Sequence, residues 1–136
     1  MRIFLDANIL FSAAGSAGAL RGFVLQLLDA GHVLCIDAYV IEEARRNLAA
    51  KREGGEAALA ALLKRLNTVP AQPYGAAVDA LTFLAEKDRP VLAAAIRGKC
   101  EALVTGDIAD FGPLFGKTVQ GVKIHSPRSL YQAVFG

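Results

Sequence analysis

The chain has 136 residues, the length of one ordinary domain, which is enough to bury a core without disulfides or a structural metal. Hydrophobic residues make up 54% of the sequence and charged residues 21%, which excludes an intrinsically disordered chain. The formal net charge of +2 is too small to indicate nucleic-acid binding by itself. We therefore expect a single domain over residues 1–136.

The cysteine pattern and the apolar runs bear on the compartment. Cys35 and Cys100 form neither a CxxC pair nor a zinc-ligand spacing, so we expect two reduced thiols in the core. Asp6 interrupts the first apolar run, which argues against a signal peptide. No apolar run approaches the ~20 residues of a membrane span. We expect a soluble, cytoplasmic protein without a membrane partner.

The N-terminal part of the sequence predicts a strand, a helix and a second strand. Ile3 to Leu5 has the apolar character of a strand buried on both faces. Residues 20–28 have the spacing of an amphipathic helix, and Gly31 is a suitable residue for its C-terminal end. Residues 32–36 predict the second strand. This order favours a right-handed parallel crossover.

A helical hairpin is expected next. Asp37 is a suitable N-cap for a helix over residues 38–52, in which Glu43 and Asn47 flank the buried face and Glu42 points to solvent. Gly54 and Gly55 end that helix. Four leucines in helical register then predict a second helix: Leu59, Leu62, Leu63 and Leu66.

The remaining elements complete an alternating α/β pattern. A short edge strand at Thr68 and Val69 precedes a predicted helix over residues 74–84. Asp88 stands at the N-cap position of a largely buried helix. Later come a strand from residue 102, one helical turn at 108–112, a strand over 122–125 and a helix over 128–135 begun by Ser126-Pro127. We expect a three-layer α/β/α sandwich with a mainly parallel sheet and a Rossmann-like topology.

Four acidic residues are predicted to meet at one edge of this sheet. Asp6 and Asp107 follow strands, Asp88 begins a helix that leads into the second of those strands, and Glu43 flanks a buried helix face. Ligands of open α/β sheets collect at the carboxyl ends of the strands. Asp110 lies one short turn beyond Asp107.

Such a cluster has a chemical consequence. Two like charges about 6 Å apart repel by ~3 kcal/mol at an effective dielectric near 20, so the cluster must take up protons or bind cations. Ligand sets made of oxygen alone select Mg²⁺ or Mn²⁺ over Zn²⁺. A carboxylate-held Mg²⁺ activates water against a phosphodiester. The sequence therefore predicts hydrolysis of a nucleic-acid strand.

Each acidic residue also has an ordinary structural explanation. Asp88 is a good N-cap, Asp107 suits a cap or an Asx-turn, and Asp110 suits a turn. Glu43 alone would be a surface glutamate. Asp6 has the weakest alternative, because we expect no helix to begin with it as a cap.

The acidic residues stand in motifs that resemble those of the PIN-domain nucleases, in particular the VapC-like toxins of prokaryotic toxin–antitoxin pairs. Leu5 to Leu10 is similar to the first motif of that family, and Glu42 to Leu48 to its second. Lys87 to Ala95 is similar to the third, and Leu103 to Asp107, continuing to Asp110 and Phe111, to the fourth. The order and separations match over nearly the whole chain.

The resemblance implies an Mg²⁺- or Mn²⁺-dependent endoribonuclease that is homodimeric and held silent by a cognate antitoxin. It implies that the metal ligands and catalytic residues are Asp6, Glu43, Asp88 and Asp107, and that Asn8, Asp110, Ser12 and Thr105 support them. The basic helical hairpin, Arg45 to Arg65, would flank the RNA groove or contribute to the dimer, with Arg45, Arg46, Lys51 and Arg52 as the expected RNA contacts. The alternative for these cations is an ordinary solvated surface.

Two other enzyme classes fit less well. A phosphatase of the haloacid-dehalogenase type needs a second aspartate two residues after the first, where this chain has Asn8. A Rossmann dinucleotide binder needs a G-x-G-x-x-G motif, which the sequence lacks. The remaining alternative is a catalytically silent PIN-like module that binds RNA or protein.

Overall fold

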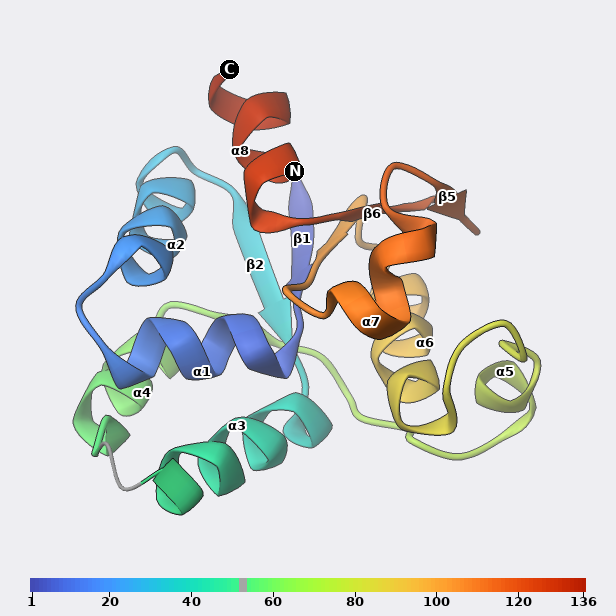
Figure 1. Ribbon diagram of the computed structural model, residues 1–136, viewed down its shortest axis with the longest axis horizontal. Helices are drawn as coiled ribbons and strands as arrows, with labels where there is room; N and C mark the ends of the chain where they lie inside the picture. Colours follow the sequence, from blue (N-terminus) through green and yellow to red (C-terminus); the bar gives the residue numbers. More distant parts are fainter. Residues whose placement is uncertain (52–53) are drawn as a thin grey trace.

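A central sheet organises the computed structural model, which describes residues 1–51 and 54–136 (Figure 1). In the described residues, six strands pair in the order β3-β2-β1-β4-β6-β5. All neighbours are parallel except β5 and β6. The strands are β1 (Arg2–Leu5), β2 (Val33–Ile36), β3 (Asn67–Thr68), β4 (Ala102–Val104), β5 (Thr118–Val119) and β6 (Val122–His125).

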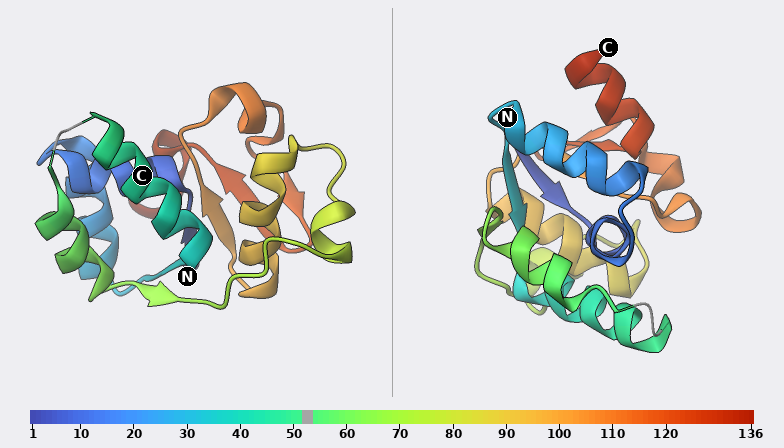
Figure 2. Two further views of the ribbon diagram at one scale, coloured as in Figure 1. Left: turned by 90° about the horizontal axis from the view of Figure 1, so that it is seen from below. Right: turned by 90° about the vertical axis from the view of Figure 1, so that its left-hand side faces the viewer.

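Helices flank this sheet on both sides, as the two views of Figure 2 show, so the predicted α/β class with a mainly parallel sheet is confirmed. The α-helices are α1 (Ala7–Gly15), α2 (Ala19–Asp29), α3 (Ala38–Lys51), α4 (Glu56–Leu63), α5 (Ala76–Asp79), α6 (Arg89–Arg97), α7 (Ile108–Phe111) and α8 (Pro127–Phe135). Two 3₁₀ turns, η1 (Glu86–Asp88) and η2 (Gly112–Leu114), precede α6 and follow α7.

The strand register decides which side chains meet at the carboxyl edge of the sheet. Leu5 pairs with Val104, and Val104 pairs with His125. Asp6 follows Leu5, and Thr105 follows Val104. These two residues therefore leave the sheet side by side. The Asp6 amide continues the ladder by donating to the Val104 carbonyl over 3.1 Å.

The core is apolar and continuous across the sheet. The residues of β4 and the last three of β1 are fully buried, and in α6 the run from Pro90 to Ala95 is buried, as its apolar composition predicts. Cys35 and Cys100 are both buried and free, which confirms the expected pair of core thiols. Over the described residues, no single helix has the length and apolarity to cross a membrane, although the bent pair α1 and α2 together meets those criteria.

Most helix ends follow their predicted caps. The Asp37 carboxylate accepts a hydrogen bond from the Val40 amide over 2.9 Å and so caps α3. Ser126 caps α8 by accepting from the Ser129 amide over 3.1 Å. Gly31 follows α2 with a φ of 88°, the left-handed conformation that commonly ends a helix.

Two elements differ from the expectation, and each has a local cause. The predicted helix over residues 74–84 is reduced to α5, because the apolar residues Val78, Leu81 and Leu84 recur every three residues and are buried by successive short turns. The antiparallel strand β5 was not expected. It joins β6 through Gln120 and Gly121, which both have positive φ, as tight hairpin turns require.

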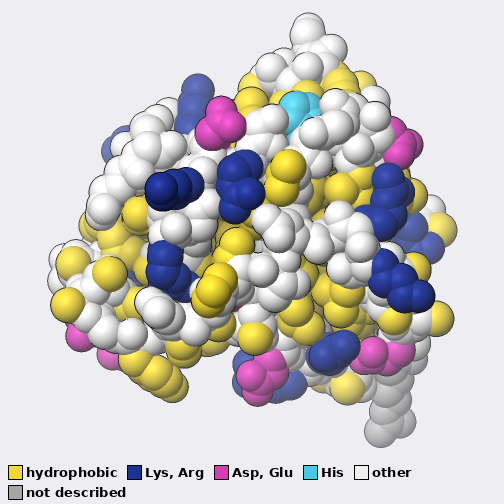
Figure 3. Space-filling view, turned by 180° about the vertical axis from the view of Figure 1, so that it is seen from behind, with side chains coloured by type: hydrophobic (Ala, Val, Ile, Leu, Met, Phe, Trp, Pro, Cys, Tyr) yellow, Lys and Arg dark blue, Asp and Glu magenta, His cyan; other side chains and the backbone are white. Residues whose placement is uncertain are grey.

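Basic side chains do not gather in one place on the rear face of the molecule. Figure 3 shows Lys and Arg side chains there, spread among apolar and acidic ones. This distribution agrees with the small net charge of +2. The rear face therefore offers no single basic patch to an anionic partner.

The short helix α7 depends on one aromatic anchor. Phe111 is fully buried, whereas Ile108 of the same helix is 74% exposed. We expect Phe111→Ala to lower the free energy of unfolding by about 3–5 kcal/mol, because it removes a large core side chain and leaves a cavity. Ile108→Ala is the matched control and should change it by less than ~0.5 kcal/mol. Equal midpoints in urea denaturation for the two variants would contradict this role of Phe111.

Candidate metal centre

A pocket of about 340 Å³ lies at the carboxyl edge of β1 and β4. It draws its walls from segments that are far apart in sequence, and all four acidic residues predicted from the sequence line it. The lining residues are Asp6, Ala7, Asn8, Glu43, Asn47, Lys87, Asp88, Gly106 and Asp107. The chain therefore folds so that carboxylates from β1, α3, η1 and the end of β4 face one space.

Asp6 is fixed by three donors. Its Oδ1 accepts from the Ala7 amide over 2.7 Å. Its Oδ2 accepts from the Thr105 hydroxyl over 2.8 Å and from the Asn8 amide nitrogen over 3.2 Å. The first of these bonds makes Asp6 the N-cap of α1, so the expectation that no helix begins with it was wrong. The apolar run after Asn8 hides the start of that helix in the sequence.

Thr105 and Asn8 connect the two strand ends. Thr105 is fully buried, and its hydroxyl oxygen also accepts from the Asp107 amide over 3.1 Å. The Asn8 side-chain oxygen accepts from the Gly106 amide over 2.8 Å. A Cβ at Gly106 would lie 3.3 Å from that oxygen, so the close approach favours glycine. This network holds Asp6 and Asp107 in a fixed relation.

Asp88 occupies the N-cap position of α6 but does not cap it. Its side chain makes no capping hydrogen bond, and only 7% of the residue is exposed. Its Oδ2 is buried with no hydrogen-bond partner among the described residues. A buried carboxylate oxygen without a donor is costly, and a bound cation is one of the usual reasons for such an atom.

Asp110 joins Asp88 and Asp107 in the tightest acidic group of the described residues. One carboxylate oxygen from each of these three residues lies within 4.8 Å of the others. Asp107 also caps α7 by accepting from the Asp110 amide over 3.1 Å. The Lys87 ammonium lies 3.3 Å from Asp110 and partly compensates this concentration of charge.

The shifts in pKa reflect the same crowding. Burial, followed by the interaction with Asp110, raises the pKa of Asp88 to about 7. The same interaction and Lys87 lower the pKa of Asp110. Burial raises the pKa of Asp6, against the opposing effect of its hydrogen bonds to Thr105 and Ala7. Burial and the neighbouring carboxylates therefore favour the protonated form of Asp88 while no cation is bound.

Helix α3 presents a polar stripe to the centre. Glu43 and Asn47 line the pocket, as their flanking positions predict, and Glu42 is exposed. Tyr39 lies one turn before Glu43, and its hydroxyl donates to the Lys87 carbonyl over 2.8 Å. Tyr39 and Lys87 were not among the residues predicted from the sequence. The spacing of 39, 43 and 47 on one helix face and the position of Lys87 beside Asp88 were the available signals.

Ser12 and the described basic residues of α3 do not line this pocket. Ser12 is exposed on α1. Arg45 is 3.9 Å from Glu56, and the Lys51 ammonium lies 5.9 Å from the centre of the Phe11 ring. Arg46 is an exposed residue of α3. Arg52 lies outside the described residues.

The donor set fits a hard divalent cation. Asp88, Asp107 and Asp110 offer only carboxylate oxygens, and the unpartnered Asp88 oxygen has no protein donor to satisfy it. Oxygen ligands of this kind suit Mg²⁺ or Mn²⁺. Asp6 and Glu43 add carboxylates on the other walls of the pocket.

Solved structures share this fold at low sequence identity. A chain in the crystal structure of VapBC2 from Rickettsia felis bound to a promoter DNA fragment aligns with a TM-score of 0.63 and 16% identity, covering 93% of this chain and 98% of that one. A chain of VapBC-1 from nontypeable Haemophilus influenzae aligns with a TM-score of 0.58 and 12% identity, covering 94% and 99%.

The sequence itself also identifies a family. No curated protein matches this sequence. A family model described as a PIN domain matches residues 2–109, which is well over half of the chain and includes Asp6, Glu43, Asp88 and Asp107. The chain therefore belongs to the PIN domain family.

Proposed function

We propose that this protein is an endoribonuclease that depends on a divalent cation. The observation that supports the proposal best is Asp88, a buried carboxylate that caps nothing and has an unpartnered oxygen within an acidic group. PIN domains are generally nucleases, which agrees with this chemistry. We further propose Mg²⁺ or Mn²⁺ as the cation and Asp6, Glu43, Asp88 and Asp107 as the residues that hold it.

When bound, the cation would activate water and neutralise charge on the phosphodiester. The chain contributes position and charge around that reaction. Asp6 is held by Thr105 and Asn8, so its carboxylate orientation is set before any ligand arrives. Lys87 lines the same pocket and places a positive charge where an RNA phosphate would lie.

RNA contact and partners belong to the same proposal. We propose that Arg45, Arg46 and Lys51 of α3 flank the RNA path together with Arg52, since α3 also carries Glu43 into the pocket. The similarity in fold to VapBC proteins supports the role of a toxin controlled by a cognate antitoxin. We propose a homodimer in the cytoplasm as the working form.

Cleavage of RNA with matched carboxamide variants tests the proposed function. We expect single-stranded RNA to be cut with Mg²⁺ or Mn²⁺ and to stay intact with excess chelator. Asp6→Asn and Glu43→Gln should lower the rate on the order of 100-fold or more, because even outer partners of metal ligands contribute 10–100-fold. Glu42→Gln is the control, because Glu42 is an exposed neighbour on the same helix.

Two outcomes would contradict the proposal. Cleavage that survives thorough chelation would remove the cation from the reaction. RNA binding without any cleavage, unchanged in Asp6→Asn, would instead identify the silent binding module considered above.

Thr105 positions Asp6 and should therefore affect activity without touching the substrate. Thr105→Val keeps the shape but removes the hydroxyl, which leaves the Asp107 amide without its partner and Asp6 with one donor fewer. We expect the free energy of unfolding to fall by about 1–3 kcal/mol and cleavage to fall about 10–100-fold. Thr105→Ser keeps the hydroxyl and should restore most of the rate. If both variants cleaved RNA equally slowly, the Thr105 hydroxyl would not be the group that positions Asp6.

The raised pKa of Asp88 predicts a pH dependence of stability in chelator. The folded protein keeps this proton up to about pH 7, whereas the unfolded chain releases it near ~4, so the folded state binds more protons in between. The contribution of Asp88 to stability is therefore complete below pH ~4 and is lost as the pH rises through 7.

Thermal melts of the wild type and Asp88→Asn between pH 4 and 8 measure this contribution. We expect the melting temperature of the wild type to fall relative to that of Asp88→Asn, whose amide does not ionise. Mg²⁺ or Mn²⁺ at pH 8 should stabilise the wild type by about 2.7 kcal/mol at one hundred times its Kd. If the melting temperatures of the wild type and Asp88→Asn changed by the same amount with pH in chelator, the raised pKa of Asp88 would be contradicted.

A further inference from the structure

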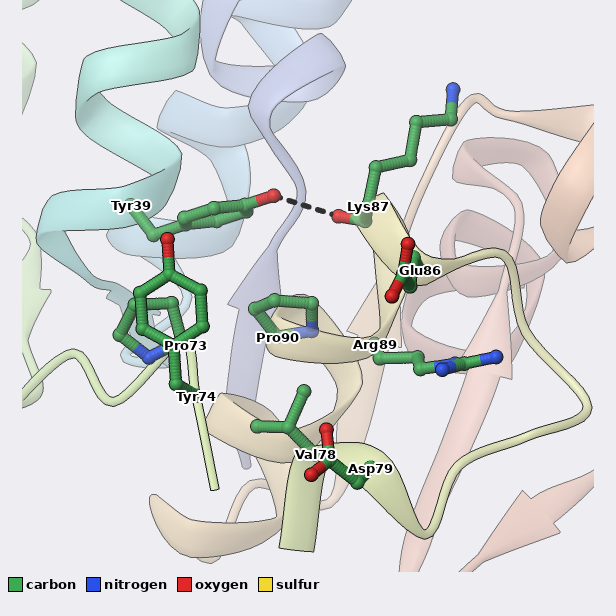
Figure 4. Close-up of a pocket in the computed structure, with 9 residues that line it drawn as sticks. All are labelled: Tyr39, Pro73, Tyr74, Val78, Asp79, Glu86, Lys87, Arg89 and Pro90. Atoms are coloured by element: carbon green, nitrogen blue, oxygen red, sulfur yellow. Dashed lines mark hydrogen bonds between the residues drawn. The ribbon is translucent and has the colours of Figure 1, made fainter. Parts of the chain in front are cut away.

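A second pocket of about 430 Å³ lies beside the acidic one (Figure 4). We call it the tyrosine pocket, and the residues that matter in its wall are Tyr39, Pro73, Tyr74, Asp79, Glu86 and Lys87. Its volume is within the range of small-molecule sites. Lys87 lines both pockets, so the two lie next to each other at η1.

Tyr39 and Lys87 form the boundary between the two pockets. The Tyr39 hydroxyl donates to the Lys87 carbonyl, which leaves its ring as part of the tyrosine pocket, as Figure 4 shows. The Lys87 side chain points away from that ring, and its ammonium lies 3.3 Å from Asp110. The residue after Lys87 is Asp88, whose unpartnered oxygen belongs to the acidic centre. A strand with a phosphate at Lys87 would thus have its next nucleotide at Tyr39.

Tyr74 is an exposed aromatic ring at this pocket. It is 89% exposed, the most exposed of the large hydrophobic side chains in the described residues, and it lies beside Pro73. Such a ring contributes little to folding, because it buries almost no surface. Aromatic rings next to a nucleic-acid path are typical stacking surfaces for unpaired bases, whatever the base.

The charges that line the tyrosine pocket balance. The two carboxylates of Asp79 and Glu86 face two cations, Lys87 and Arg89. Arg89 Nε donates to the Leu84 carbonyl over 2.9 Å, and the Lys87 side chain points away from the tyrosine rings. The carboxylates can accept hydrogen bonds from the amino groups of a base. An uncharged base therefore suits this pocket, and Lys87 offers its charge to the neighbouring phosphate.

We propose that the tyrosine pocket holds an unpaired base of the RNA strand, next to the phosphate at the acidic centre, with Tyr74 as its stacking surface. This inference rests on the proposed function, because it assumes that RNA enters the acidic pocket. It names the substrate as single-stranded at the nucleotide beside the cleaved bond, since a paired base is not free to stack on Tyr74.

The three tyrosines of the chain allow a direct binding test. Protein labelled with 3-fluorotyrosine gives separate ¹⁹F signals for Tyr39, Tyr74 and Tyr131, which Tyr→Phe variants assign. Tyr131 is the internal control, because it lies on α8 against the rings of Phe23 and Phe135. Hexaadenylate and hexacytidylate are added with Mg²⁺ to the Asp6→Asn variant, so that binding is observed while cleavage is slow. We expect the signals of Tyr39 and Tyr74 to shift and that of Tyr131 to stay.

Tyr74→Ala then tests whether stacking supplies affinity. We expect it to weaken hexaadenylate binding about 5- to 150-fold, the range that stacking of one base implies. It should leave the binding of an abasic hexamer, which has the same ribose-phosphate backbone, unchanged. Tyr131→Ala is the matched control and should weaken neither ligand.

The inference is overturned if RNA binds while the Tyr39 and Tyr74 signals stay still, or if Tyr74→Ala weakens both hexamers equally. It is also overturned if Tyr74→Ala weakens only the binding of a protein partner. The proposed function fails separately, in the cleavage assay with Mg²⁺. RNA that shifts Tyr74 but is never cut would leave the base pocket in place and remove the nuclease.

Discussion

The parallel pairing of β1 with β4 is the constraint on which the candidate centre depends. Leu5 opposite Val104 sets Asp6 beside Thr105 at the point where both strands leave the sheet. A shift of one strand by one residue would turn its side chains to the other face and would separate Asp6 from Thr105. The buried side chains of both strands pack against their neighbours on both faces, and this packing opposes such a shift. The packing of the core thus secures the geometry of the polar site.

The centre contains an electrostatic conflict that the protein resolves only in part. Asp88, Asp107 and Asp110 crowd together, and Lys87 supplies one opposing charge from an exposed position. While no cation is bound, protonation of Asp88 lowers the remaining repulsion among the three carboxylates. A structural role would be better served by amides, which carry no charge and still form hydrogen bonds. The persistence of carboxylates here is therefore best explained by a ligand of opposite charge.

The order of the elements could be predicted well from the sequence, because strands buried on both faces and amphipathic helices leave distinct patterns. The convergence of Asp6, Asp88 and Asp107 on one pocket followed from their places at element ends, and that of Glu43 from its position beside the buried face of α3. Patterns of this kind report which face a residue occupies, and they identify the edge of the sheet before any distance is known.

Features that depend on exact turns were harder to predict. The role of Asp6 as a cap was hidden, because α1 begins directly after it and is apolar. The helix predicted over residues 74–84 is only the short α5, because successive turns bury apolar residues at a spacing that resembles that of a helix. Tyr39 and Lys87 depend on a hydrogen bond across 48 residues of sequence, which no local pattern encodes. The position of Asp110 beside Asp88 likewise depends on tertiary contacts, so it could not be predicted from local sequence patterns.

The two outermost strands, β3 and β5, are only two residues long each. Pro70 follows the first of them closely and has no amide hydrogen to offer. Few backbone groups are therefore open at either border for another polypeptide to pair with. Growth of the sheet into ribbons or fibres is disfavoured, and any companion molecule must engage side chains on the helical flanks rather than add itself as a further strand.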